Sequence, residues 1–277
     1  MEEAVKRSLR RRLLRWYARH GRALPWRATR DPYAVLVSEV MLQQTQVSRV
    51  VPRYREFLRR FATPRALARA SLADVLRVWS GLGYNRRARD LHRIARLAPR
   101  GIPTDPVALD ALPGVGAYTA GAVACFSTGA RVAFADTNIQ RVLGRIVLGH
   151  TATDREAVDL DRMLMSRDAA RWHHALMDLG ATVCTSRAPR CTACPLRGEC
   201  RARGRIAAGP RRRQAPFAGS TRRLRGRVVA LLAAAADGMT VRALRERVAD
   251  DRAGTVLRDL ARDGLIERVR GRVRLPG

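Results

Sequence analysis

Four cysteines close to residue 200 carry the most specific chemistry in this sequence. Cys184, Cys191, Cys194 and Cys200 fall within 17 residues, in the pattern Cys-x6-Cys-x2-Cys-x5-Cys. Four thiolates this close in a chain are soft ligands, and they predict a zinc or iron–sulfur centre. Structural zinc sites usually contain two tight cysteine pairs, whereas this sequence has one Cys-x2-Cys, which favours a [4Fe–4S] cluster. The fifth cysteine, Cys125, lies in a small-residue segment and is expected to be a buried thiol.

Two carboxylates lie in local sequences that favour opposite protonation states. Glu39 is the single charged residue in the apolar run 35–42. The simpler interpretation is a glutamate on the exposed face of a helix. If Glu39 instead faces a pocket, desolvation favours its protonated form and suits it to general acid catalysis. Asp136 lies where an amphipathic run, 139–148, begins; aspartate is a preferred N-cap residue, and helix N–H groups favour its ionised form.

A glycine-rich turn precedes Asp136 in the same segment. Residues 112–116 read Leu-Pro-Gly-Val-Gly, and the two glycines tolerate positive φ. The small-residue run 117–126 follows as a predicted helix, whose first N–H groups could bind a phosphate oxygen. A packed turn is the plainer interpretation of Gly-x-Gly by itself. The presence of Asp136 in the same segment keeps a phosphate-binding turn as the alternative.

Most of the sequence predicts helices. Apolar residues recur at three-to-four spacing, and few stretches alternate as strands do. We expect helices over residues 4–20, 32–47, 64–79, 88–97, 117–126 and 139–148. Two irregular stretches, 22–27 and 79–87, combine aromatic residues with arginines. Each is either an ordinary connection or a surface that stacks on bases and contacts phosphates.

The charge balance points to a polyanionic partner. The 277 residues carry a formal net charge of +30, with a sequence pI of about 11.7. Nucleic acid is the simplest partner for such a chain. No run of about 18 apolar residues exists, so no membrane span is expected. The first residues contain no signal-peptide core, which predicts a cytoplasmic, nucleoid-associated protein.

Six motifs together resemble the MutY-type adenine DNA glycosylases of the helix-hairpin-helix superfamily. They are LPWR (24–27), SEVMLQQTQV (38–47), GLGY (81–84), LPGVGAYTAGAV (112–123), DTNIQRVL (136–143) and MDLGATVC (177–184), which leads into the cysteines. The resemblance extends from about residue 10 to residue 200. It implies an all-α, two-lobed, endonuclease III-like fold with a [4Fe–4S] cluster on the four cysteines. It also implies excision of adenine mispaired with 8-oxoguanine or guanine after the base is flipped out of the duplex.

The resemblance implies roles for individual residues. Glu39 matches the family's general acid, which protonates the departing adenine, and Asp136 matches the carboxylate that stabilises the oxocarbenium-like sugar. Tyr118 and Asn138 match residues that support this pair. The implied adenine pocket consists of Arg22, Trp26, Arg27 and Leu42. The implied contacts with the duplex are Gln43, Gln44, Tyr84, Gly114, Val115 and Gly116.

The sequence also predicts domain boundaries. The iron–sulfur lobe is expected over 1–26 and 135–200, and a six-helix lobe with the helix-hairpin-helix over 27–134. Residues 201–221 are rich in Arg, Gly and Pro and predict a flexible basic linker. Residues 222–277 show three amphipathic segments and an alternating end with a turn at Arg270-Gly271. This pattern predicts a winged-helix-like domain, or else a small packing domain with a basic surface.

The expected partner is double-stranded DNA with a mismatch, bound by a monomer. Full-length members of the family carry a Nudix-like C-terminal domain that recognises 8-oxoguanine, and this sequence shows none. The preference for 8-oxoguanine opposite adenine is therefore left open. One alternative is a thymine or uracil mismatch glycosylase, which the LQQTQV motif argues against. The other is a non-catalytic iron–sulfur DNA-binding regulator, which needs neither Glu39 nor Asp136.

The sequence also speaks against strand cleavage. Glycosylases that nick DNA commonly attack the sugar with an amine and form a Schiff base. Lys6 is the only lysine of this chain, and it lies in none of the motifs. In the related endonuclease III pattern a lysine occupies the place of Tyr118. The sequence therefore predicts a monofunctional glycosylase that leaves an abasic site.

Overall fold

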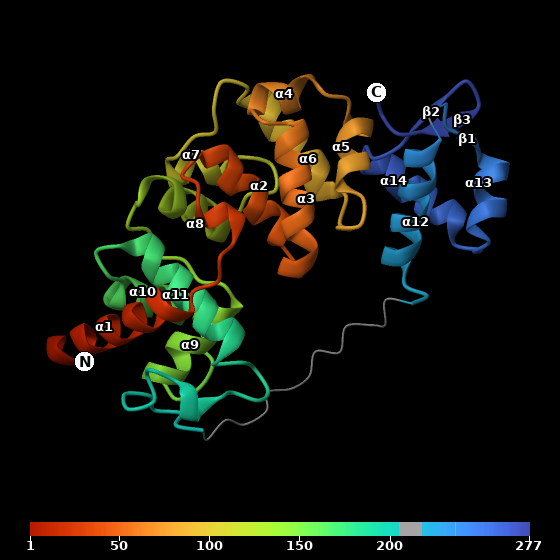
Figure 1. The fold of residues 1–277 in the computed structure, drawn as a ribbon. Helices are drawn as coiled ribbons and strands as arrows, with labels where there is room; N and C mark the ends of the chain where they lie inside the picture. The colour runs from red at the N-terminus through yellow and green to blue at the C-terminus, as the bar shows by residue number, and fades with distance from the viewer. Residues whose placement is uncertain (205–217, 236) are drawn as a thin grey trace. The chain divides into compact units, whose positions relative to one another are not determined.

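The computed structural model describes residues 1–204, 218–235 and 237–277. In these residues the chain forms fourteen α-helices, two short 3-10 helices and three short strands (Figure 1). This architecture confirms the predicted all-α class. The chain groups into two compact units: unit 1 comprises Met1–Val35, Thr104–Asp110 and Val115–Arg211, and unit 2 comprises Leu36–Pro103, Ala111–Gly114 and Arg212–Gly277. No helix in the described residues is long and apolar enough to cross a bilayer.

Unit 1 is built around two packed helices, α9 and α11. Its elements are α1 (Glu3–His20), η1 (Pro25–Arg27), α7 (Pro106–Asp110), α8 (Ala117–Thr128), α9 (Thr137–Val147), α10 (Asp154–Leu164), α11 (Ala169–Thr182) and η2 (Cys191–Ala193). α11 packs on α9 and on α1, which lies alongside it in Figure 1, and α9 also packs on α10. Leu13, Leu143 and Leu176, one from each of three helices, are fully buried in this core.

The crossing of α9 and α11 requires a residue without a side chain. A Cβ atom at Gly180, on α11, would lie 2.6 Å from the Cβ of Asn138. Asn138 is the second residue of α9, and Asp136 is the N-cap of that helix. The glycine therefore lets α11 approach α9 at the turn that holds Asp136.

Unit 2 begins within α2 (Pro32–Leu42), which starts in unit 1. It continues with α3 (Val47–Arg60), α4 (Pro64–Arg69), α5 (Leu72–Trp79) and α6 (Arg86–Leu97). α6 packs on α4 and α5, and α3 packs on α5. Phe57 and Trp79 are fully buried there, with their rings edge to face and their centroids 6.1 Å apart.

Two of the predicted helices are interrupted, and polar groups explain both breaks. The helix predicted over 32–47 ends at Leu42, and Gln44 takes a left-handed backbone with φ of 54°. The carbonyl groups at this end bond to the guanidinium of Arg87 in place of further helix N–H groups. The helix predicted over 64–79 is two helices, α4 and α5. The hydroxyl of Ser71 accepts the N–H of Asp74 at 3.0 Å and so starts the second one.

The second part of unit 2 is a small helical module with a three-stranded sheet. It contains α12 (Thr221–Ala234), β1 (Met239–Thr240), α13 (Val241–Val248), α14 (Ala253–Arg262), β2 (Glu267–Val269) and β3 (Arg272–Arg274). The strands are antiparallel in the order β1-β3-β2. Arg270 and Gly271, with φ of 49° and 76°, form the predicted hairpin turn between β2 and β3. Three helices with a terminal hairpin form the expected winged-helix-like arrangement.

The predicted domain boundaries remain a prediction. The two compact units divide the chain at other positions, since α7 and α8 group with the helices around α9. Most of the predicted linker, residues 205–217, lies outside the described residues.

Replacing Gly180 with alanine should destabilise the protein. The added methyl group would collide with Asn138 at the crossing of α9 and α11, and overpacking of this kind costs about 1–3 kcal/mol. Urea unfolding of Gly180→Ala measures the loss. The control is Gly226→Ala on α12, where no atom lies within 4 Å of the new Cβ. There alanine should raise stability by about 0.5–1 kcal/mol. Equal stability of the two variants would contradict the close approach of α11 to α9 at Gly180.

Candidate functional site

The Asp136 turn is held by three hydrogen bonds on one carboxylate. Oδ1 accepts the backbone N–H groups of Asn138 at 2.9 Å and Ile139 at 2.8 Å. Oδ2 accepts the side-chain amide of Asn138 at 2.7 Å. Asp136 is the N-cap of α9, as its sequence predicts, and it remains half-buried. Both carboxylate oxygens thus have a fixed direction before any ligand arrives.

Buried side chains of α10 and α11 support the segment that leads into this turn. The backbone N–H of Phe134 donates to Asp161 at 3.3 Å. The ring of Phe134 stacks on His173 with centroids 3.9 Å apart, and Tyr118 meets the same ring edge-on at 5.6 Å. His173 in turn bonds to Asp161 at 2.8 Å. Asp161 and His173 were not predicted as site residues, since neither lies in a motif. They are polar residues that their helices bury, which the sequence does not show.

Arg141 joins the Asp136 turn to the first predicted cysteine ligand. Its guanidinium donates to the side-chain oxygen of Asn138 and to the carbonyl of Gly180, both at 2.7 Å. The same group donates to the carbonyl of Cys184 at 2.6 Å. Arg141 and Asn138 belong to the DTNIQRVL motif, whereas Gly180 and Cys184 lie 39 and 43 residues further along the chain, so the role of Arg141 was not readable from the sequence.

The four predicted metal ligands line one cavity. Cys184, Cys191, Cys194 and Cys200 border it together with apolar side chains of α9 and α11. The buried guanidinium of Arg145 lies 3.5 Å from the sulfur of Cys184 and donates to the carbonyls of Thr185 and Ser186. Four thiols on one cavity are the donor set of iron–sulfur clusters and of zinc sites.

The predicted pocket arginines share a buried aspartate that the sequence analysis missed. Arg27 donates both terminal nitrogens to Asp178 at 2.8 Å, and Nε of Arg22 donates to it at 2.6 Å. Burial alone would raise the pKa of Asp178, but Arg27 and Arg22 outweigh it and hold that pKa below its ordinary value. Asp178 is fully buried and lies in the MDLGATVC motif. Both terminal nitrogens of Arg27 are thus used in this ion pair. Arg22 is 31 % exposed, and Trp26 is buried.

Glu39 lies inside unit 2. It is 6 % exposed, and its neighbours on α2, Val37 and Val40, are also buried. The interpretation of Glu39 as an exposed helix-face residue is therefore wrong. Leu42 ends the same helix and is half-buried. The packing of α2 therefore holds the Glu39 side chain away from bulk water.

One half-buried arginine positions both loops that were predicted to contact DNA. Nη1 of Arg87 donates to the carbonyls of Val40, Met41 and Gln43, at 2.8, 2.9 and 2.5 Å. Nη2 donates to the hydroxyl of Thr45 at 3.0 Å and to the carbonyl of Gly83 at 3.2 Å. Burial lowers the pKa of Arg87 to about 10, so it is charged at neutral pH. The Gln43–Gln44 loop and the turn that ends at Tyr84 are therefore brought together.

Each of the two loops contains one residue with a strained backbone. Gln44 and Tyr84 have φ of 54° and 49°, a region that side chains other than glycine rarely adopt. Such strain persists only where surrounding contacts hold it, and it clusters at functional sites. Gln44 is exposed and Tyr84 is half-buried.

The predicted phosphate-binding turn contains one strained glycine. Gly114 has φ of 73°, and a Cβ there would lie 3.2 Å from the Asp90 side chain. Gly116 has an ordinary φ of −117° and is the N-cap of α8. It has no side chain to accept the first N–H groups of that helix. Only Gly114 therefore needs the conformational freedom expected of both. Val115 is buried.

Removing the guanidinium of Arg87 should destabilise unit 2. Several carbonyls would lose their hydrogen-bond donor, and each unpaired carbonyl costs about 1–3 kcal/mol. We therefore expect Arg87→Met to lower the free energy of unfolding by at least about 3 kcal/mol. Arg87→Lys should recover little, because one ammonium group cannot reproduce the planar fork. Urea unfolding is the measurement. Arg93→Met, an exposed arginine of the same helix, should change stability by less than about 0.5 kcal/mol. Equal losses for Arg87→Met and Arg93→Met would refute the role.

Comparison with known proteins places these features in a family. Residues 37–164 match the family described as "HhH-GPD superfamily base excision DNA repair protein". The chain is 44% identical to an adenine DNA glycosylase of Mycobacterium tuberculosis, over 96% of this chain and 92% of the relative. It is 45% identical to an adenine DNA glycosylase of Mycolicibacterium smegmatis, over 79% of this chain and 78% of the relative.

A solved structure shares the fold. A thermostable thymine-DNA glycosylase superposes with a TM-score of 0.66 at 25% identity, covering 73% of this chain and 98% of its own. The match leaves about a quarter of this chain uncovered. The motifs, the helical architecture and the high identity over nearly the whole length agree, and the chain belongs to the adenine DNA glycosylase family of the helix-hairpin-helix superfamily.

Proposed function

We propose that this protein is a monofunctional DNA glycosylase that excises adenine mispaired with 8-oxoguanine or guanine in base excision repair. The observation that carries the proposal is 44% identity, over 96% of the chain, to a protein named adenine DNA glycosylase. The two carboxylates required for the chemistry stand in suitable settings: Glu39 is buried, and Asp136 is a hydrogen-bonded N-cap. The protein acts as a monomer on DNA inside the cell.

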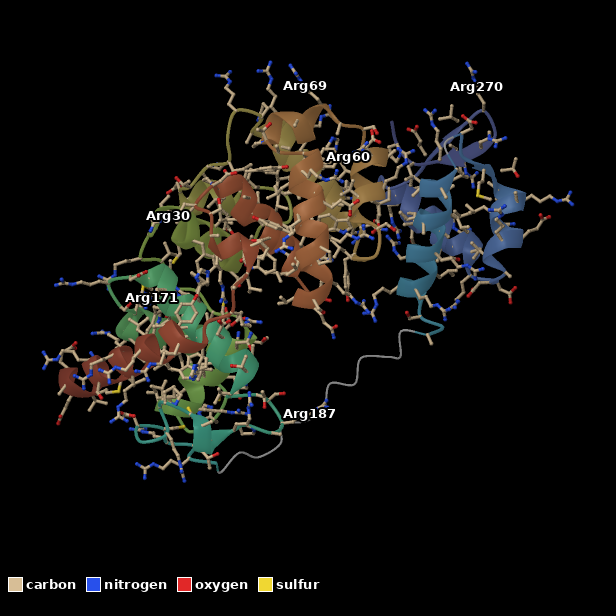
Figure 2. The ribbon with its side chains drawn as sticks, in the orientation of Figure 1. Arg30, Arg60, Arg69, Arg171, Arg187 and Arg270 are labelled. Carbon is tan, nitrogen blue, oxygen red and sulfur yellow. The ribbon has the colours of Figure 1, made fainter. Side chains whose placement is uncertain are left out.

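Double-stranded DNA is bound by an arginine-rich surface. Many of the arginines behind the net charge of +30 are exposed. Figure 2 shows Arg69 and Arg270 extending away from the ribbon. Contacts of this kind with phosphates give affinity without sequence preference. Gly114, Val115 and Gly116 bind a phosphate of one strand at the start of α8, where backbone N–H groups favour an anion.

The adenine must leave the base stack before its glycosidic bond can be reached. Gln43, Gln44 and Tyr84 enter the duplex and fill the space of the extruded base. Arg87 ties the two loops together, so insertion needs no large rearrangement of either. Arg22, Trp26, Arg27 and Leu42 form the adenine pocket, and Arg27 acts there through the rigid pair it makes with Asp178.

The reaction is acid-assisted hydrolysis. Glu39 donates its proton to a ring nitrogen of adenine, so the C1′–N9 bond breaks with its electrons retained by the departing base. The sugar becomes oxocarbenium-like, and the Asp136 carboxylate stabilises its positive charge. Asn138 and the helix N–H groups hold that carboxylate in place, and Tyr118 packs on Phe134 beside it. Water adds to C1′ and returns a proton to Glu39, leaving an abasic site.

The four cysteines hold a [4Fe–4S] cluster. They line one cavity whose other walls are largely apolar, and Arg145 bonds to carbonyls of the same loop. With the cluster bound, the four thiolates would cross-link residues 184–200. Arg141 and Arg145 connect that loop to α9, and hence to the Asp136 turn.

A second candidate is removal of thymine or uracil from mismatches. The structural similarity to a thymine-DNA glycosylase supports it. The higher identity to adenine glycosylases over a longer part of the chain favours adenine. A cleavage assay with different mispairs separates the two candidates.

Single-turnover cleavage of duplexes with A:8-oxoguanine, A:G, T:G and U:G pairs tests the activity. We expect adenine release, with strand breaks only after alkali, because no lysine is placed to form a Schiff base. Glu39→Gln should lower the rate by about 10²–10⁴-fold by loss of the general acid. Asp136→Asn should lower it by about 10²–10³-fold. The control, Glu56→Gln on the surface of α3, should leave the rate unchanged. Release of thymine or uracil alone would overturn the adenine assignment.

Elemental and spectroscopic analysis tests the cluster. The purified protein should be brown, contain iron and acid-labile sulfide, and absorb broadly in the blue. Cys194→Ser should lose this absorbance and its iron, whereas Cys125→Ser should retain both. Cys125 is fully buried on α8 and does not line the cavity that the other four cysteines share. A colourless wild-type protein that binds zinc would refute the assignment.

A further inference from the structure

The C-terminal module, residues 221–277, is part of the same compact unit as the Tyr84 loop. In this unit α12 packs on α5, the helix that leads into Gly81–Tyr84. The backbone N–H of Ala73 donates to the carbonyl of Pro276 at 2.9 Å. Nε of Arg77 donates to the carbonyl of Ala233 at 3.2 Å. The module is therefore attached to α5 by hydrogen bonds at two positions, Ala73 and Arg77.

A nearly buried aspartate anchors the module beside the same loop. Asp263, at the end of α14, is 4% exposed and accepts guanidinium hydrogen bonds from Arg86 and Arg225. Its carbonyl accepts from Arg89. The hydrogen bond from Arg86 outweighs burial and holds the pKa of Asp263 below its ordinary value. Arg86 and Arg89 begin α6, two and five residues after Tyr84. The anchor thus fixes the module at the base of the loop.

One residue of the module contacts Tyr84 itself. Nη1 of Arg222 donates to the Tyr84 hydroxyl at 2.9 Å. The guanidinium carbon of Arg222 lies 5.7 Å from the centroid of the Tyr84 ring, and that of Arg87 lies 5.2 Å from it. Two cationic groups therefore contact one aromatic ring, each within the range of a cation–π interaction. The strained backbone at Tyr84, with φ of 49°, needs contacts of this kind to persist.

We propose that the C-terminal module positions the DNA-contacting tyrosine, with Arg222 as the positioning residue that holds the Tyr84 hydroxyl. This inference deepens the proposed function and rests on the role of Tyr84 in the duplex. It assigns the module a task that involves no lesion recognition of its own. Arg222 acts through Tyr84 and touches neither the adenine nor the sugar.

A double-mutant cycle tests the coupling. Arg222→Met and Tyr84→Phe each remove one partner of the hydrogen bond. Each should weaken binding to a duplex with a non-cleavable adenosine analogue opposite 8-oxoguanine by about tenfold. The double variant should bind no more weakly than either single variant. Arg222→Lys keeps a cationic donor and should recover part of the loss. Arg223→Met removes the exposed arginine next in the chain and should bind like wild type.

Hydrogen exchange of the backbone amides over 81–86 supplies a readout that needs no DNA. Arg222→Met should accelerate this exchange, and Arg223→Met should not, while both variants keep the melting temperature of wild type. Additive losses in the double variant, or equal behaviour of Arg222→Met and Arg223→Met, would overturn the inference. If wild type releases no adenine, the proposed activity fails by itself. Amide hydrogen exchange over 81–86 and binding of the variants to the mismatched duplex would then still decide whether Arg222 positions Tyr84.

Discussion

Hydrogen bonds from buried and half-buried guanidinium groups to backbone carbonyls hold this chain where regular helix stops. The last carbonyls of a helix have no intrahelical donor, and burying them unpaired is costly. Arg87 supplies donors at the end of α2 and at the Gly83 turn. Arg141 does so at Gly180 and Cys184, and Arg145 does so at Thr185 and Ser186. Each of these arginines connects segments distant in sequence, and the connected segments carry the predicted site residues.

Because arginines also hold the fold together, the high arginine content is not explained by DNA binding alone. A charge of +30 suggests a surface for DNA, and exposed arginines such as Arg69 and Arg270 fit that view. Part of the charge nevertheless works inside the fold. A guanidinium directs five donors in a plane and can bond to several carbonyls at once, whereas lysine offers a single ammonium group. A sequence with one lysine can therefore build junctions that a lysine-rich chain of equal charge could not.

The two carboxylates of the proposed mechanism reach their settings by different routes. Asp136 depends on neighbours in sequence, because its hydrogen-bond donors are Asn138 and Ile139. Glu39 depends on packing, because only the burial of α2 removes it from water. Around the Asp136 turn, Asp161 and His173 hold Phe134, and Gly180 admits α11. The proposed reaction, cleavage of a glycosidic bond with charge development on the sugar, needs both an acid and an anion.

Local signals in the sequence were sufficient for features whose partners are close in the chain. The start of α9 at Asp136, the helices 4–20 and 117–126, the Arg270-Gly271 turn and the family all followed from short motifs and spacing. The end of α2, the Asp178 pair, the burial of Glu39 and the Asp263 anchor did not. Tertiary structure decided these: the burial of Glu39 depends on the packing of α2, and the other three depend on a charge or a carbonyl meeting a partner tens to hundreds of residues away. Hydrophobic periodicity records which face of a helix is buried, and it carries no information on which polar group that face will meet.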